Sequence, residues 1–537
     1  MVSRLNQSLS FHSSPESFIS SRLEHLSYLN SEVLPASPGV GVRKLRPIIR
    51  ASILNRNVHI VSSYRLCEAI LKFGSASGGS DFSQIDQEPS HQEEVAAILV
   101  AAVSGPSNGD EPVFTARLAY AQFMSAFFPG PNVLLEDGPQ HAAHRERWKQ
   151  QLKHIPEISQ SMIRSLTVKR LIEPLQGAKS TNEGKSIDLY SAMKSLAWDL
   201  LFGIFLGLDR NENGAVFSEL ERSQVDLLQG QFSLFPVSIK TPFWSSPRSK
   251  GLDAVKNVNG ILRKRLRQVG HAGDTGARRS TCPFMQRFRE REQEETPLTD
   301  EDVVSHTLLF TSSLVNKALA SLLTAYLLNL FMWRDGVDRT SGGGLADLIR
   351  SQEDRPMAQR MLESILSETE RLSPPIVGVM RRVTQDIVLR GATDQKAQDE
   401  TSDCLVRQGE DVWLYLAGAG RDNDVFEGAD QFVWDRFMSC EDSHEAGHTF
   451  GRGTKTCMGY ALVRQICLTV ASSILDSTIS FRGVVSEQGV RHWLGWEKDV
   501  PHEVVARDVK QLPSQRPRRP VNVEVILGKS PSETQSP

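Results

Sequence analysis

The stretch that decides the fold lies near the carboxyl end and reads Phe450-Gly451-Arg452-Gly453-Thr454-Lys455-Thr456-Cys457-Met458-Gly459. Its glycines allow sharp backbone turns, because glycine adopts positive φ angles without steric cost. The apolar pattern that follows predicts a helix from near Cys457 to about residue 475. At the amino terminus of a helix, backbone N–H groups and the positive end of the dipole stabilise a thiolate. The stretch therefore predicts a thiolate ligand at position 457.

A heme-thiolate site requires this arrangement of loop and helix. Gly451 and Gly453 would let the backbone approach a flat macrocycle. Gly459 would let the following helix pack under the porphyrin, and Phe450 would shield the sulfur from water. The competing interpretation is a structural cysteine buried in a glycine-rich turn.

Composition narrows the class of protein. Of the 537 residues, 39% are apolar and 23% are charged, as in ordinary folded proteins. The net charge of −3 gives no basic field for nucleic acid. Six cysteines without CxxC spacing argue against a disulfide framework and favour a reducing compartment.

The sequence offers no uninterrupted apolar run long enough for a transmembrane helix, which needs roughly 18 residues. The amino terminus is too polar for a signal peptide. We therefore expect a cytoplasmic protein without a transmembrane anchor. A peripheral contact with the endoplasmic reticulum membrane stays open.

The pattern along the chain predicts one large domain. Residues 1–39 are expected to form a partly disordered segment, 40–510 a single mainly helical domain with small β-sheets, and 511–537 a strand and a disordered tail. Thr299, a plausible N-cap followed by three acidic residues, opens a long apolar helix that is expected to run to about Trp333. A further helix over 357–373 ends before Pro374 and Pro375.

Three more motifs precede the cysteine loop. Residues 368–371 form an ExxR pattern, which places Glu368 and Arg371 on one helix face. Residues 432–437 form an FxxxRF-like pattern with Arg436, and its third residue is Trp434. Residues 141–145 form an HxxxR pattern with His141 and Arg145.

Along the chain the four motifs occur in the order HxxxR, ExxR, FxxxRF and cysteine loop. In that order they resemble the cytochrome P450 superfamily over about residues 40–510, although Trp434 stands where that family commonly has proline. The resemblance implies a mainly α fold with small sheets (α+β), in which heme b lies between the long central helix and the helix after Cys457. It implies that Cys457 ligates the iron and that Glu368, Arg371 and Arg436 form a buried salt-bridge network. The cofactor-binding residues that it implies are His141, Arg145, Arg381, Phe450, Arg452, Lys455 and Gly459, several of them on the propionates.

The resemblance also implies a monooxygenase that hydroxylates, couples or desaturates a small organic molecule. Electrons would come from NADPH through a reductase or a ferredoxin-type donor, and Ser/Gln-rich insertions suggest microbial secondary metabolism. A basic dock for that partner would lie beside the propionate site, at Arg145, Arg147, Lys149 and Lys153. The sequence carries no code for the substrate.

The chain departs from the family where most oxygen-activating members carry an acid and an alcohol on the central helix. Leu314 and Val315 occupy those places. Thr311, Ser312 or Asn316 could relay protons instead, through ordered water. Alternatively, the protein rearranges a lipid hydroperoxide without a reductase, as similar family members with a nearby asparagine do, or it is a non-catalytic heme sensor.

A rival motif, HEAGH at residues 444–448, matches the HExxH signature of zinc peptidases. HExxH requires a helix that places both histidines on one face. Here Gly447 and the nearby glycine-rich loop leave too little room for that helix. The zinc metallopeptidase therefore remains a minor alternative, and His448 fits a histidine that often precedes the cysteine loop in the resembled family.

Overall fold

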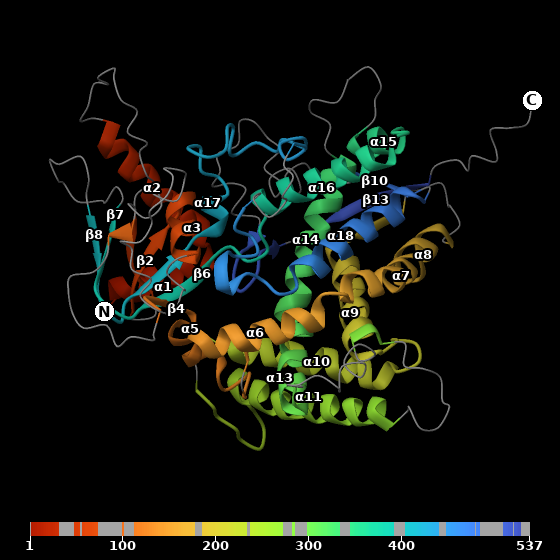
Figure 1. Cartoon of the computed structure of the whole chain (residues 1–537), viewed down its shortest axis with the longest axis horizontal. Helices are drawn as coiled ribbons and strands as arrows, with labels where there is room; N and C mark the ends of the chain where they lie inside the picture. The colour runs from red at the N-terminus through yellow and green to blue at the C-terminus, as the bar shows by residue number, and fades with distance from the viewer. Residues whose placement is uncertain are drawn as a thin grey trace, which may run out of the picture.

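The computed structural model describes residues 2–31, 48–53, 56–72, 99–100, 112–130, 132–177, 185–233, 237–271, 282–284, 298–332, 344–390, 403–439, 447–477, 479–483, 509–518 and 520–527. The chain is mainly helical, and its largest sheet lies at one side of a broad helical region (Figure 1). The predicted α+β class is therefore confirmed.

The largest sheet has the strand order β1-β2-β9-β6-β4. Its strands are β1 (Ile49–Ile53), β2 (Arg56–Val61), β9 (Asp411–Leu414), β6 (Val379–Val383) and β4 (Phe114–Thr115). β2 and β9 pair in parallel, and the other neighbours are antiparallel. In this sheet β6, which follows Pro375 in the sequence, lies between β9 and β4.

The smaller sheets have the orders β10-β13-β5, β3-β7-β8 and β11-β12. Their strands are β10 (Ile479–Gly483), β13 (Asn522–Leu527), β5 (Lys185–Asp188), β3 (Leu99–Val100), β7 (Ile387–Arg390), β8 (Asp403–Val406), β11 (Val509–Lys510) and β12 (Arg516–Pro517). The predicted carboxyl-terminal strand is β13, and its pairing with β5 and β10 makes it part of the main domain. The expected disordered tail, residues 528–537, lies outside the described residues.

The amino-terminal segment is folded where it is described. Residues 2–31 form α1 (Val2–Ser13) and α2 (Pro15–Ser31). Phe11 and Phe18 are buried, and the ring of Phe11 meets that of Trp413 edge to face at 4.9 Å. Residues 2–31 are thus helical, and the apolar side chains of Phe11 and Phe18 cover the sheet. The rest of the segment that the sequence predicts to be partly disordered lies outside the described residues.

Helices supply most of the core. They are α3 (Tyr64–Lys72), α5 (Ala116–Met124), α6 (Gly138–Leu152), α7 (Ile155–Thr167), η1 (Val168–Ile172), α8 (Glu173–Gly177), α9 (Leu189–Leu206), α10 (Gly214–Gln231), α11 (Pro247–His271), α13 (Asp300–Phe310), α14 (Ser313–Met332), α15 (Leu345–Arg350), α16 (Arg355–Leu372), α17 (Leu416–Ala419), η3 (Gly453–Lys455) and α18 (Tyr460–Leu475). α16 ends just before Pro374, as its sequence predicts.

The central helix is interrupted, whereas the sequence predicts one continuous helix from Thr299 to about Trp333. Thr299 does cap α13, in a capping box with Asp302. The interruption falls at Thr311 and Ser312, between α13 and α14. The Thr311 hydroxyl donates to the carbonyl of Thr307 at 2.7 Å, and the Ser312 hydroxyl accepts from the amide of Val315 at 3.4 Å. These side chains compete with the helical hydrogen bonds and end one helix before the next begins.

Two described helices, α9 and α14, are long and apolar enough to cross a membrane by length and composition. The apolar segments of α9 and α14 are 72% and 78% buried inside the fold, as those of core helices are. Both helices meet these criteria because they contribute apolar side chains from nearly every face to one core.

Candidate active site

The loop before α18 is bent by two glycines with positive φ, +72° at Gly451 and +65° at Gly453. A Cβ atom at Gly453 would lie 2.6 Å from the carbonyl oxygen of Leu71, at the end of α3, so only glycine fits there. The amide of Cys457 donates to the carbonyl of Phe450 at 2.7 Å and closes the loop. The loop is therefore fixed against α3 and delivers Cys457 to the start of α18.

Cys457 differs from the other described cysteines. Its side chain is exposed, whereas Cys67, Cys282, Cys404 and Cys467 are buried. Burial nevertheless raises the pKa of the Cys457 thiol, while the amides of Gly459 and Tyr460 and the charge of Arg145 act in the opposite direction. Both observations hold if the exposed surface faces an enclosed space. A metal ion in that space would deprotonate the thiol, and the two amides would stabilise the thiolate.

Three basic residues, His141, Arg145 and Lys455, lie at or beside this loop. His141 is buried on α6, and burial together with Lys455 and Arg145 lowers its pKa to about 4. Arg145 donates to the carbonyl of Thr456 at 2.5 Å. Lys455 is paired with Asp137 at 3.0 Å, which makes it a less available anion ligand than the sequence suggests.

Three buried nitrogen atoms of these residues have no hydrogen-bond partner among the described part of the chain. They are Nε2 of His141, Nε of Arg381 and Nε of Arg452. A buried donor without a partner is costly, so an acceptor is missing. The carboxylates of heme propionates are acceptors of the right charge. The donor set therefore fits the propionates of a heme, and Cys457 would supply the ligand to its iron.

The distal residues predicted from sequence lie at or near the break in the central helix. Thr311, Ser312 and Asn316 are all buried. The Asn316 amide donates to the carbonyl of Lys194 on α9 at 3.0 Å, and its Oδ1 has no described partner. No Asp or Glu occurs between Asp302 and Asp335, so this stretch of helix supplies no carboxylate for proton transfer.

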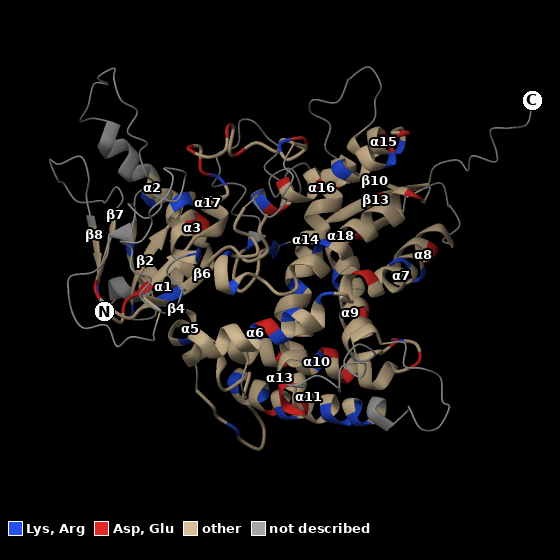
Figure 2. Cartoon of the chain, in the orientation of Figure 1, with Lys and Arg blue, Asp and Glu red and all other residues tan. Residues whose placement is uncertain are grey.

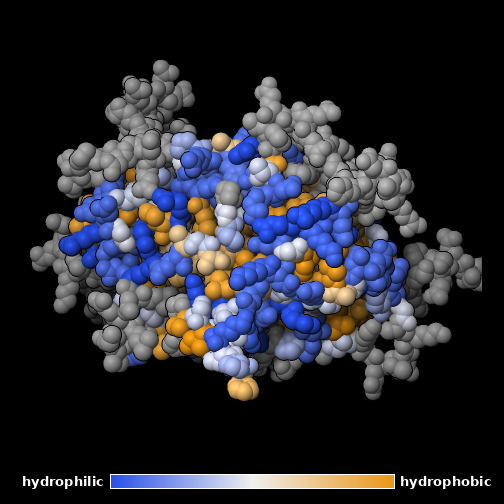
Figure 3. Space-filling model, turned by 90° about the horizontal axis from the view of Figure 1, so that it is seen from below, coloured by the Kyte–Doolittle hydropathy of each residue, from blue (hydrophilic) through white to orange (hydrophobic). Residues whose placement is uncertain are grey.

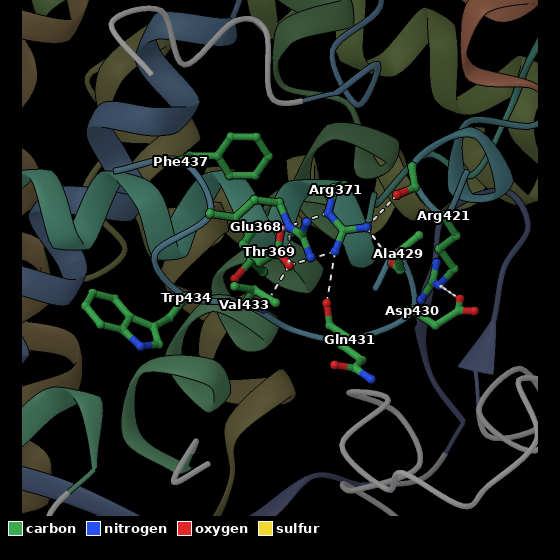
Figure 4. A network of polar contacts seen from close by, with 12 residues as sticks. Glu368, Thr369, Arg371, Arg421, Ala429, Asp430, Gln431, Val433, Trp434 and Phe437 are labelled. Atoms are coloured by element: carbon green, nitrogen blue, oxygen red, sulfur yellow. Dashed lines mark hydrogen bonds and ion pairs between the residues drawn. The ribbon is translucent and has the colours of Figure 1, made fainter. Parts of the chain in front are cut away.

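The ExxR motif forms a buried network with the segment after α17 (Figure 4). Arg371 and Glu368 are fully buried and joined twice, at 2.7 Å and 2.6 Å. The remaining donors of Arg371 reach the carbonyls of Gly420, Ala429 and Gln431. All five guanidinium N–H groups are thus used.

Glu368 also holds the third member of the predicted network. It accepts from the amide of Val433 at 2.9 Å and from Arg436 at 3.3 Å. Trp434, which stands in place of proline, offers its carbonyl to the Ser364 hydroxyl at 2.7 Å. The structure therefore brings Glu368, Arg371 and Arg436 together, and they fix the segment that leads to the cysteine loop.

The rival motif is only partly described. His444 and Glu445 lie outside the described residues. His448 is stacked on Tyr64, and its Nε2 hydrogen-bonds the Tyr64 carbonyl at 3.1 Å. Within the described ranges, no cluster of three metal-ligating side chains occurs. His448 thus ties the cysteine loop to α3.

Sequence reasoning missed a polar cluster between α6 and α13. His144 contacts Glu136 at 2.9 Å and Asp302 at 3.5 Å. His306 is stacked on Trp148 with 4.4 Å between ring centroids. His144 lies one turn from His141, but nothing in the sequence around His306 signals that the two helices meet there.

We expect His306 to make the fold sensitive to acid. Burial lowers its pKa to about 4, and its Nε2 accepts from the amide of Val133 at 3.3 Å, which requires a neutral ring. The unfolded chain therefore binds the proton first, and stability present above pH 6.5 is lost as pH falls toward 4. Full protonation of His306 in the folded protein lowers the free energy of unfolding by on the order of 3 kcal/mol.

Urea unfolding at about pH 7.5 and about pH 5 measures this loss. The His306→Gln variant should lose less stability between the two pH values than the wild type. His154→Gln is the matched control, since His154 is only half-buried. Equal losses for wild type and His306→Gln would contradict the assignment.

Comparison with known proteins agrees with this geometry. The family model for cytochrome P450 matches residues 342–477, which include the ExxR motif and the cysteine loop. The chain is 21% identical to cytochrome P450 85A1 of Arabidopsis thaliana over 40% of this chain and 43% of that protein. It is 27% identical to cytochrome P450 107B1 of Saccharopolyspora erythraea over 28% of this chain and 32% of that protein. The chain thus matches less than half the length of both relatives.

Solved structures resemble at least 90% of the chain. Cyanobacterial CYP120A1 with bound retinoic acid has a TM-score of 0.59 and 16% identity, covering 90% of this chain and 92% of that one. P450BioI, in complex with an acyl carrier protein ligated to hexadec-9Z-enoic acid, has a TM-score of 0.54 and 15% identity, covering 95% and 99%. The chain has the fold of solved cytochrome P450 structures, and residues 342–477, which hold the ExxR motif and the cysteine loop, are similar to the cytochrome P450 family.

Proposed function

We propose that the chain is a heme-thiolate monooxygenase that oxidises a small organic molecule, with electrons from NADPH through a reductase. The observation that carries this proposal is the placement of Cys457, whose sulfur has exposed surface and meets the amides of Gly459 and Tyr460. Bound heme supplies the oxidative chemistry, and thiolate donation favours O–O cleavage. A role in microbial secondary metabolism rests on the composition of the insertions alone.

The chain's own residues hold and tune the cofactor. Gly459 and Tyr460 donate to the sulfur and moderate its negative charge. Arg145 and Arg381 offer positive charge to the propionates, and the unpartnered Nε2 of His141 and Nε of Arg381 can donate to them. Near the helix break, Ser313 Oγ and Asn316 Oδ1 are buried without a described partner and can hold water for proton transfer.

A second candidate is a hydroperoxide isomerase or dehydratase on the same scaffold. It is favoured by Leu314 and Val315, which replace the acid and the alcohol, and by the absence of any carboxylate between residues 302 and 335. Such an enzyme needs neither reductase nor relayed protons from a carboxylate.

Turnover assays separate the two candidates. The holoprotein is incubated with candidate substrates, NADPH and a reductase, and separately with lipid hydroperoxides alone. A monooxygenase consumes dioxygen and NADPH in proportion to the product that it forms. Two results together would contradict the leading proposal and support the second. These are rapid conversion of hydroperoxides and no NADPH-dependent consumption of oxygen with any substrate that binds.

For the electron donor we propose the basic outer part of α6 as the dock. Lys149 and Lys153 are exposed there, near Arg145. The double variant Lys149→Glu/Lys153→Glu should slow reduction of the heme by the reductase several-fold at low salt, and less at high salt, because screening weakens steering. Stopped-flow reduction measures this effect. Arg360→Glu, at an exposed position of α16, is the control, and an equal effect of both charge reversals would contradict the dock.

A further inference from the structure

Glu370 lies within the ExxR motif but makes a contact separate from the network of Glu368 and Arg371. It is two residues from Glu368 and therefore on roughly the opposite side of α16. Its side chain is buried and meets α18, which packs against α16 near the middle of the molecule (Figure 1). Glu370 thus belongs to a second buried contact, between α16 and the helix that follows Cys457.

The carboxylate of Glu370 is paired with Arg464 of α18. Its Oε2 accepts from Nη1 of Arg464 at 2.6 Å, and both side chains are buried. Nη2 of Arg464 also donates to the hydroxyl of Ser367 at 3.3 Å, one turn earlier on α16. The other oxygen of Glu370, Oε1, is buried and has no partner among the described residues. The loss of either partner would therefore leave a buried charge uncompensated.

The backbone of Glu370 holds the other side of the cysteine loop. Its carbonyl accepts from the hydroxyl of Thr449 at 2.6 Å. Thr449 precedes Phe450, at the start of the loop. Arg464 lies one turn after Tyr460, at the start of α18. One residue of α16 thus contacts both the segment that enters the loop and the helix that leaves it.

Aromatic side chains connect these contacts to the surroundings of the sulfur. The ring of Tyr460 meets that of Phe450 edge to face at 4.9 Å, and the guanidinium of Arg464 lies 5.7 Å from the centre of the Tyr460 ring. The amide of Tyr460 donates to the sulfur of Cys457. The position of that amide therefore depends on a residue that Glu370 holds.

The surroundings of this pair differ from those of basic residues at the surface. Figure 2 shows Lys and Arg along α11, and Figure 3 shows hydrophilic residues over much of this underside. Lys256 and Lys264 of α11 are exposed, so water and salt screen their charges. Glu370 and Arg464 are shielded from both, and the removal of one partner therefore costs far more than at the surface.

We propose that Glu370 and Arg464 are positioning residues that hold Cys457 in place as the thiolate ligand. The proposal rests on heme ligation by Cys457. The two residues act through the loop, since their described contacts reach its two sides rather than the sulfur itself. Without the pair, α18 can shift against α16, and the amides at its start move away from the sulfur. The sulfur then accepts a proton from solvent and becomes a neutral thiol.

The carbon-monoxide complex of the reduced holoprotein tests the proposal, because its absorption distinguishes a thiolate from a neutral ligand. Spectra are followed over time below the unfolding temperature. The measurement is made at about pH 8.5, where Glu370 is ionised, since burial raises its pKa to about 7. Arg464→Met and Glu370→Gln should each convert to the neutral-ligand band at least about tenfold faster than wild type. Glu370→Gln/Arg464→Gln should convert more slowly than either, because two amides can hydrogen-bond without a buried charge.

Arg210→Met is the matched control for a general loss of stability. It breaks an ion pair of 3.2 Å with the buried carboxylate of Asp199 on α9, outside the contact between α16 and α18. It should lower the unfolding temperature but convert at the wild-type rate, as should Lys264→Met at the surface. Two results would overturn the proposal: single variants that convert as slowly as wild type, or Arg210→Met converting as fast as Arg464→Met. A wild type that never shows the thiolate band would overturn the proposed function itself, and this proposal with it.

Discussion

Replacing Arg371 with methionine is expected to prevent the accumulation of folded holoprotein. Methionine keeps much of the volume but removes all five donors, and it leaves the fully buried Glu368 carboxylate with Arg436 at 3.3 Å and the amide of Val433. Breaking a buried ion pair from one side costs about 3–5 kcal/mol. Each buried carbonyl left without a donor adds about 1–3 kcal/mol. The sum rivals the whole stability of a typical domain, about 5–15 kcal/mol.

Soluble yield and heme content per protein measure this effect. Arg360→Met is the matched control, because Arg360 is exposed on the same helix. Arg371→Lys should fall between the two, since lysine keeps the charge but cannot occupy both carboxylate oxygens and three carbonyls at once. A soluble Arg371→Met protein with normal heme content would contradict the structural role of the network.

Replacing Cys457 with alanine is expected to abolish thiolate ligation and to reduce turnover to background. No other described cysteine can take its place, because Cys67, Cys282, Cys404 and Cys467 are buried. Burial raises the pKa of Cys467 far above its ordinary value, so that thiol stays protonated. The absorption spectrum and the heme content of the purified variant measure the effect.

Cys467→Ala is the control for this substitution. It removes a thiol from the same helix, ten residues after Cys457, and costs only the packing of a small buried side chain. Its spectrum should match that of the wild type. A Cys457→Ala variant that retains the thiolate spectrum would place the iron ligand elsewhere.

The local motifs predicted the core of the site because their chemistry is local. Gly451 and Gly453 bend the loop by positive φ, and Gly459 caps the next helix, so short-range backbone geometry alone delivers Cys457. Glu368 and Arg371 meet because i and i+3 share a helix face. Their carbonyl partners at 420–431 come from a segment whose irregular path no pattern in the sequence reveals.

Other features depend on contacts between distant segments and could not be predicted. The break at Thr311 and Ser312 arises when hydroxyl hydrogen bonds compete with an otherwise apolar helix. The amino-terminal helices are stabilised by packing of Phe11 against Trp413, about 400 residues later in the chain. Lys455 resembles a propionate ligand in sequence, but Asp137 of a distant segment pairs with it.

The central claim is that an iron porphyrin is bound through the sulfur of Cys457. The difference spectrum between the reduced protein with and without carbon monoxide tests it most directly. The structure predicts the long-wavelength Soret band that thiolate ligation produces, lost in Cys457→Ala and kept in Cys467→Ala. A purified, folded protein that binds no heme, or one whose carbon-monoxide complex shows only the shorter-wavelength band of a neutral ligand, would contradict it.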